Sequence, residues 1–235
     1  ASKMPVGMLV TKADTGRIFR HQLKRCKTEY FDYYLLHALN AKYLEKAEKL
    51  GVFEYLQNKK AEGKIKKLGF SFHDSAEVLD RILTRHPEME FVQLQINYLD
   101  WEDENIEAKK CLEVAKKYDK QVMIMEPYKG GFLADVPEEA EKIMKEHNPD
   151  KSVVSWAMRF VANLDDVSVV LTGASNLEQL ESNISEIKNA TPLNDEELEI
   201  IKEVSEIINS NITVDCTTCR YCVDVCSEEI DIAKI

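Results

Sequence analysis

Glycine is scarce in this sequence, with eight residues among 235. The eight cannot form the G-x-G-x-x-G pattern of a dinucleotide-binding turn or a phosphate-binding P-loop, so neither nucleotide site is expected. Long apolar runs are also missing: none approaches the roughly 20 residues that span a bilayer, and the first ten residues lack the features of a secretion signal. These absences predict a soluble, cytoplasmic protein with no membrane partner.

Positive charge is in deficit as well. Lysine and arginine number 31 against 42 acidic residues, which gives a net charge of −11. Binding to a nucleic-acid backbone needs clustered positive charge, so no nucleic-acid partner is expected. With 44% apolar and 31% charged residues, the chain can bury a core. Its length suits one large domain, or one domain with a small appendage.

Short apolar runs alternate along the chain with longer segments of helical period. The predicted strands are nearly continuously apolar, as strands covered on both faces should be, and span residues 2–8, 30–36, 67–72, 91–97, 121–125 and 167–171. The predicted helices span residues 17–27, 46–60, 75–83, 104–117, 137–145, 151–162, 177–187 and 194–208. This alternation predicts an α/β fold with a parallel sheet.

A doubly wound sheet and a closed (β/α) barrel both fit this alternation. The missing glycine fingerprint favours the barrel. So do the polar residues that end the apolar runs, because the carboxyl ends of barrel strands converge on one face, where active sites are built. Any one of them has a plain explanation as a polar loop residue, but the set indicates a site: Lys3, His37, Ser71, His73, Gln95, Asn97, Glu126, Lys129, Thr172 and Ser175.

Three residues within predicted elements have structural explanations. Cys26 and Cys111 each stand alone in a helical segment and are expected to be small buried apolar residues rather than reactive thiols. Asp32 lies inside an apolar strand, where a carboxylate would need a buried partner.

The last twenty residues hold the other four cysteines, Cys216, Cys219, Cys222 and Cys226. Their C-x2-C-x2-C-x3-C spacing is that of bacterial iron–sulfur ligation, in which the fourth cysteine binds the second cluster of a pair. Structural zinc sites more often use two separated C-x2-C pairs. We predict a 4Fe-4S cluster, with zinc and disulfides as alternatives. The spacing allows two arrangements: all four thiolates bind one cluster, or the fourth thiolate binds a second cluster.

Motifs along the whole chain resemble the aldo/keto reductase family, in its branch with a C-terminal ferredoxin-like extension. YYLLH, ending at His37, resembles the fourth-strand motif, and SKMP around Lys3 resembles the third. The motifs LGFSFH, QINY, MEP and GASN fall at the ends of the fifth to eighth strands. The resemblance implies an incomplete (β/α) TIM-type barrel over residues 1–190, followed by a helix and a ferredoxin-type 4Fe-4S segment over residues 191–235.

The resemblance also implies an activity: hydride transfer between NADP(H) or NAD(H) and a small-molecule carbonyl or alcohol substrate, coupled to a 4Fe-4S cluster and a redox partner protein. The implied catalytic residues are Lys3, whose ammonium would lower the pKa of a tyrosine acid, and His37, which would orient the substrate oxygen. The implied cofactor-binding residues are Ser71, Gln95, Gly173, Ser175, Gln179 and Asn183.

The sequence departs from the family pattern at both ends. The family's first two strands carry the catalytic tyrosine and an aspartate, yet only Ala1 and Ser2 precede Lys3, and none of the nine tyrosines has an Asp-x-x-x-x-Tyr-Gly context. The sequence also stops nine residues after Cys226. We therefore expect a shortened reductase that lacks its first two βα units and its proton donor. An iron–sulfur electron-transfer protein with the barrel as scaffold, and an inactive fragment, are the alternatives.

Overall fold

The computed structural model describes residues 1–162 and 164–212, together with residues 223, 226, 228 and 230. The chain forms two compact units. The first comprises Ala1–Ile96, Asp100–Met125 and Asp166–Val169, and the second comprises Asn97–Leu99, Glu126–Asp165 and Val170–Ile235. No helix in the described ranges has both the length and the apolar composition needed to cross a bilayer.

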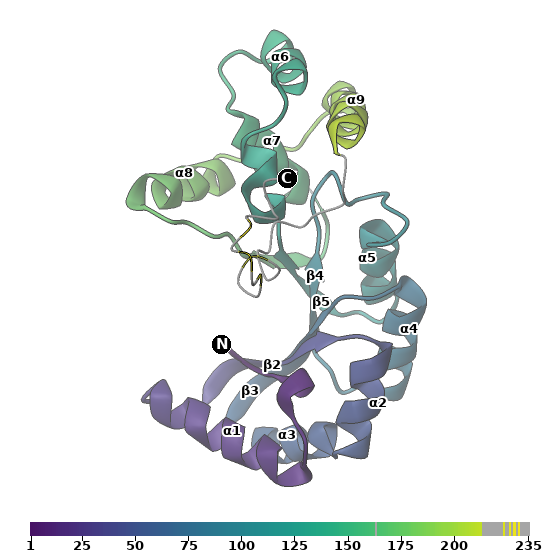
Figure 1. Cartoon of the computed structure of the whole chain (residues 1–235), viewed down its shortest axis with the longest axis vertical. Helices are drawn as coiled ribbons and strands as arrows, with labels where there is room; N and C mark the ends of the chain where they lie inside the picture. The colour runs from purple at the N-terminus through teal and green to yellow at the C-terminus, as the bar shows by residue number, and fades with distance from the viewer. Residues whose placement is uncertain (163, 213–222, 224–225, 227, 229, 231–235) are drawn as a thin grey trace. The chain divides into compact units, whose positions relative to one another are not determined.

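A six-stranded sheet forms the first unit, and its strands pair in the order in which they follow along the chain (Figure 1). The strands are β1 (Ser2–Met4), β2 (Phe31–Leu39), β3 (Ile65–Phe72), β4 (Phe91–Gln95), β5 (Gln121–Met125) and β6 (Val167–Val170). The pairs from β1 to β5 are parallel. A doubly wound sheet reverses its strand order at a switch point. The in-order sheet therefore rules out that alternative and agrees with part of a (β/α) barrel.

Helices cover one face of this sheet (Figure 1). They are α1 (Lys12–Arg25), α2 (Ala41–Lys49), α3 (Val52–Ala61), α4 (Ala76–Arg85) and α5 (Ala108–Lys117), with a short 3-10 helix η1 (Val6–Met8) after β1. Side chains alternate between the two faces of a strand. The side chains on one face of the sheet contact the helices. The opposite face carries a buried apolar cluster of Leu35, Phe91 and Met123, with Tyr33 packed against it.

The second unit is helical. It contains η2 (Lys129–Ala134), α6 (Glu138–His147), α7 (Val153–Ala162), α8 (Leu177–Lys188) and α9 (Asp195–Asn211). Helix α7 is buried from Ser155 to Val161 and packs against α8 and η2, while α6 packs against α9. Arg159 of α7 forms a buried ion pair with Glu197 of α9, which ties these two helices together.

The strand predictions are confirmed, and the strand predicted at residues 121–125 has the same bounds as β5. The first strand is shorter than predicted: it ends at Met4 before Pro5, which has no N–H for a sheet hydrogen bond. The single helix predicted at residues 46–60 is wrong. Gly51 takes a left-handed conformation (φ 66°) and separates α2 from α3.

Two predictions about single residues are also wrong. Asp32 is exposed, so its carboxylate stays in water and needs no buried partner. Cys26 is exposed at the end of α1, whereas Cys111 is buried as predicted. Sequence periodicity does not show that Asp32 faces solvent, because it lies between apolar neighbours on both sides.

Candidate functional site

Lys3, His37 and His73 gather at the carboxyl ends of β1, β2 and β3. Lys3 pairs in register with Leu35 of β2, and His37, two residues further on, projects from the same face as Leu35. His73 directly follows β3, and its backbone N–H donates to the carbonyl oxygen of Leu39 over 3.1 Å. Strand pairing thus brings together three nitrogen-bearing side chains that are far apart in the sequence.

Burial and charge set the ionisation of this group. Burial lowers the pKa of Lys3. Burial also lowers the pKa of His37, and the positive charge of Lys3 lowers it further. The pKa of His73 is lowered by burial and then by the charges of His37 and Lys3. Because the ordinary histidine pKa is about 6.5, both imidazoles are neutral at pH 7 and can donate one N–H to a carbonyl oxygen.

A bulge in β2 determines the backbone conformation next to His37. The pairing of β2 with β3 shifts register between Leu36 and Leu39, and Ala38 has a left-handed conformation (φ 54°). The Ala38 N–H, which the bulge removes from the ladder, donates to the Oγ of fully buried Ser71 over 2.9 Å. Ser71 therefore holds the chain next to His37. The predicted contact of Ser71 with a cofactor stays a prediction.

Gln95 ends β4, and its side-chain position is fixed by an acidic neighbour. Its Nε2 donates to the Oδ2 of Asp100 over 2.8 Å, and Asp100 is buried. The sequence prediction did not include Asp100, since nothing distinguishes it in sequence from an ordinary loop carboxylate. His73 was recognised as a strand-end residue but was not assigned to the site, because its closeness to His37 follows only from strand pairing.

The other predicted cofactor residues lie together in the second unit, at the start of α8. Asn183 is buried and its Nδ2 donates to the Gly173 carbonyl oxygen over 3.2 Å. The Ser175 N–H donates to Gln179 Oε1 over 2.7 Å. Residues 173–180 are exposed, so the first turn of α8 is open to an anion. Residues 171–187 contain three glutamates and no lysine or arginine, so a phosphate group here would depend on backbone N–H groups alone.

The cysteine motif lies mostly outside the described residues, which include only Cys226 of its four thiols. Among the residues that the structure describes, no group of three histidine, cysteine or acidic side chains is arranged to hold a metal ion. The assignment of Cys216, Cys219, Cys222 and Cys226 as cluster ligands therefore rests on their spacing and on the preference of iron–sulfur clusters for thiolates.

Replacing Lys3 with methionine is expected to raise the pKa of both His37 and His73, because it removes a nearby positive charge. An NMR titration of the imidazole resonances measures this directly. Unchanged titration of His37 in the variant would contradict the arrangement described above.

Comparison with known proteins assigns the family. The family model described as the aldo/keto reductase family matches residues 1–206. Among solved structures, the holo form of the aldo-keto reductase AKR11C1 from Bacillus halodurans is similar with a TM-score of 0.69 and 22% identity, covering 86% of this chain and 70% of that one. No curated protein sequence matches.

Two further structures show the same likeness. An aldo/keto reductase from Klebsiella pneumoniae, solved in complex with NADP and acetate, has a TM-score of 0.63 and 22% identity, covering 86% of this chain and 68% of that one. The glycerol dehydrogenase AKR11B4 from Gluconobacter oxydans has a TM-score of 0.63 and 22% identity, covering 87% and 67%. At these identities the structural likeness shows the fold alone.

Proposed function

Because this chain belongs to the aldo/keto reductase family, we propose that it acts in NAD(P)H-dependent interconversion of small-molecule carbonyl compounds and alcohols. The observation that carries the proposal is the placement of Lys3, His37 and Gln95 at the carboxyl ends of strands in one parallel sheet. These strand ends are where (β/α) barrels build their active sites. Lys3 and His37 are the proposed catalytic residues.

The proposed role of Lys3 and His37 is to stabilise charge and to donate a hydrogen bond. A bound nicotinamide supplies the hydride. The neutral His37 imidazole donates an N–H to the substrate oxygen, which orients the carbonyl and stabilises the negative charge that develops on it. The Lys3 ammonium favours the ionised form of a proton-donating phenol. No tyrosine of this sequence stands in the family's context for that phenol, so the proton step is assigned to no residue here.

The nucleotide contacts are proposed in two groups. Gln95, held in place by Asp100, would bond the carboxamide of the nicotinamide, and Ser71 is the other proposed contact of this group. Gly173, Ser175, Gln179 and Asn183 would form the phosphate-binding turn before and within α8, where backbone N–H groups at a helix start suit an anion.

The charge of this turn predicts a preference between the two nucleotides. NADH is expected to bind about tenfold more tightly than NADPH, because the added 2′-phosphate needs a cationic partner and would meet glutamates instead. Titrations of nicotinamide fluorescence measure both affinities. Glu178→Lys should reduce the ratio of the NADH affinity to the NADPH affinity. Glu203→Lys, which makes the same charge change on α9, should leave that ratio unchanged. Absence of saturable binding of either nucleotide would count against the proposed function.

The cysteine tail is proposed to bind a 4Fe-4S cluster through Cys216, Cys219, Cys222 and Cys226, within a segment that begins at residue 191 after the barrel portion of residues 1–190. The cluster would exchange electrons with the barrel site or with a redox partner protein. A reducing cytoplasm is the proposed location, because it preserves thiolate-bound clusters. The cysteine spacing also favours a second candidate, an electron-transfer protein whose barrel is only a scaffold.

Anaerobic purification tests the cluster. The chain is expected to contain iron and acid-labile sulfide and to absorb visible light. Cys219→Ser should lose most of both elements, whereas Cys26→Ser, the same change at an exposed cysteine outside the motif, should keep them. A colourless chain without iron and sulfide would refute the cluster. A chain with the cluster but no nucleotide binding would instead favour the electron-transfer protein.

A further inference from the structure

Charge is divided unevenly along this chain. Residues 1–72, which end with β3, contain 15 lysines and arginines against seven acidic residues, which gives a net charge of +8. Residues 73–235 hold the remaining 16 basic and 35 acidic residues, which gives −19. The overall charge of −11 therefore conceals a basic part that attracts acidic surfaces and an acidic part that attracts basic ones.

Helix α1 carries a row of positive charge. Its inner side is fixed by buried Phe19, whose ring packs edge-on against Tyr55 of α3, the helix that lies beside α1 in the first unit (Figure 1). The outer side carries Arg17, Arg20 and Lys24, which are all exposed. Because they follow one another at intervals of three and four residues, they lie along one face of the helix.

Helix α9 carries a row of negative charge with the same intervals. Its inner side is fixed by a buried apolar face that includes Val204 and Ile208. The outer side carries Glu199, Glu203 and Glu206, which are all exposed and follow one another at intervals of four and three residues. The two rows are thus similar in length and opposite in sign.

Few of these charges are neutralised within the chain. Arg17 pairs with Asp14, and Glu199 pairs with Lys202, each within one helix. The side chains of Arg17 and Glu199 are still 70% and 72% exposed, so both can also reach a partner. In the part of the chain that the structure describes, the other four charges of the two rows form no ion pair.

We propose that α1 of one copy of this chain binds along α9 of a second copy through these two rows. The helices contain 14 and 17 residues, so they can lie side by side over about 20 Å. In either direction the intervals of the two rows match, which places Arg20 and Lys24 opposite Glu199 and Glu203. Because the contact joins two different surfaces, each copy can make it twice, once through each helix.

The charge pattern favours a second copy over a nucleic acid as the partner of α1. A duplex carries one negative charge per roughly 1.7 Å and extends beyond a single helix, so it would be repelled by a chain of net charge −11. A row of carboxylates on one helix matches the extent of the α1 row, and the chain itself supplies such a row. The proposal needs no bound nucleotide and does not depend on the proposed function.

Sedimentation equilibrium of the whole chain measures this self-association. At about 0.1 M ionic strength the Debye length is about 10 Å, which weakens the repulsion between two acidic chains but leaves charges in contact attracted. The average mass is expected to rise above that of one copy as the concentration increases. At about 1 M, where the Debye length is about 3 Å, the dissociation constant should increase at least about tenfold.

Charge reversal tests which surfaces are in contact. Arg20→Glu with Lys24→Glu gives two acidic rows, and Glu199→Lys with Glu203→Lys gives two basic rows, so neither double variant should associate with itself. An equal mixture of the two should associate again, because each variant supplies the row that the other lacks. A variant that had lost its fold could not recover in this way.

The matched control is Lys42→Glu with Lys49→Glu, which makes the same charge change as the α1 variant at exposed positions of α2. It should associate as the wild type does. A chain that is monomeric at every concentration, association that persists unchanged at about 1 M salt, or a mixture that stays monomeric would overturn the proposal. Binding of a short DNA duplex by a wild type that does not self-associate would also overturn it, in favour of a nucleic-acid partner.

Discussion

Replacing Arg159 with alanine is expected to lower the free energy of unfolding by about 3–5 kcal/mol, because it leaves the Glu197 carboxylate buried without its counter-ion. The guanidinium and the carboxylate form two parallel hydrogen bonds of 2.6 and 2.7 Å, and both side chains are only 5% exposed. The guanidinium also donates to the carbonyl oxygens of Thr191 and Pro192, which precede α9. Urea unfolding of the second unit's helices, followed by circular dichroism, measures the loss.

An exposed ion pair on the same helix is the control. Lys202 and Glu199 of α9 are also 2.6 Å apart, but their side chains are 60% and 72% exposed. Lys202→Ala should therefore cost no more than about 0.5 kcal/mol. If Arg159→Ala and Lys202→Ala lower the free energy of unfolding by similar amounts, burial does not make the Arg159–Glu197 pair more important for stability.

Acid should weaken the buried pair in a defined range. The hydrogen bonds from Arg159 hold the pKa of Glu197 below its ordinary value, although burial acts in the opposite direction. A carboxyl whose pKa is lower in the folded state stabilises the fold above its unfolded pKa of about 4.3, and this contribution disappears as the pH falls through the folded value. Stability should thus decline below about pH 4.3 in the wild type, and this part of the decline should be missing in Glu197→Gln.

Gly69→Ala is expected to destabilise the first unit by about 2–3 kcal/mol. Gly69 of β3 pairs with Phe91 of β4, and a Cβ at this position would overlap the Phe91 carbonyl oxygen and lie 2.8 Å from two ring carbons. Phe91 cannot easily move, because its ring packs in the cluster with Leu35 and Met123. The strain would fall on the strand pair that leads to Ser71 and Gln95.

Gly173→Ala is the matched control, since a Cβ there would meet no atom within 4 Å and the backbone does not require glycine. Its effect on stability should stay within about 0.5 kcal/mol. Thermal and urea unfolding of both variants give the comparison. If Gly69→Ala is as stable as Gly173→Ala, the close approach of β3 and β4 is less tight than described.

The sheet could be predicted from sequence because each strand is a short apolar run between polar segments. The bounds of β5 were predicted fully, and the polar residues at the strand ends indicated one edge of the sheet. The end of β2 was missed, because the strand continues through His37 to Leu39 with a bulge at Ala38. A left-handed alanine has no sequence signal, and its stabilising partner Ser71 lies 33 residues away.

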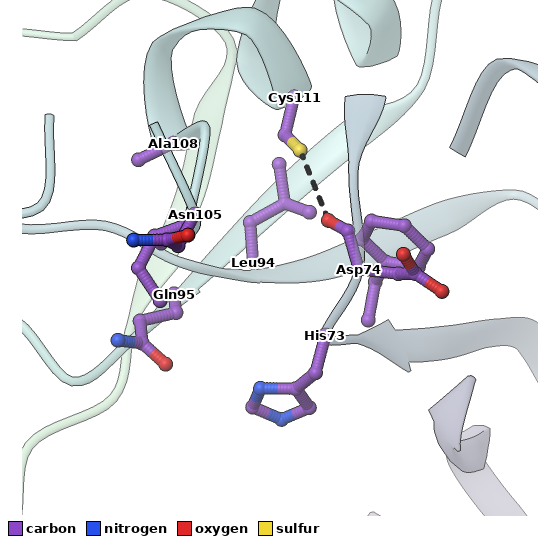
Figure 2. A pocket seen from close by; sticks show the side chains of 9 residues that line it. His73, Asp74, Leu94, Gln95, Asn105, Ala108 and Cys111 are labelled. Atoms are coloured by element: carbon purple, nitrogen blue, oxygen red, sulfur yellow. Dashed lines mark hydrogen bonds between the residues drawn. The ribbon is translucent and has the colours of Figure 1, made fainter. Parts of the chain in front are cut away.

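The arrangement of the site was less predictable than its residues. Lys3 and His37 were identified by motif, but their interaction with His73 depends on the register of three strands. A cavity at the ends of β3 and β4 (Figure 2) also escaped prediction, because it forms only where Ala108 and Cys111 of α5 meet these strand ends, and α5 looks in sequence like an ordinary amphipathic helix. The division between α2 and α3 depends on one backbone angle at Gly51, which the helical period conceals.

The in-order strand pairing also bears on how this sheet assembles during synthesis. Each strand binds the strand made immediately before it, so a nascent chain leaving the ribosome needs no later segment before β1 and β2 can join. Every new strand then adds to an existing edge and closes only the one crossover that joins it to the strand before, which limits the entropy cost of each step. Growth from the N-terminus can thus proceed stepwise, with apolar surface covered as quickly as translation supplies the next strand.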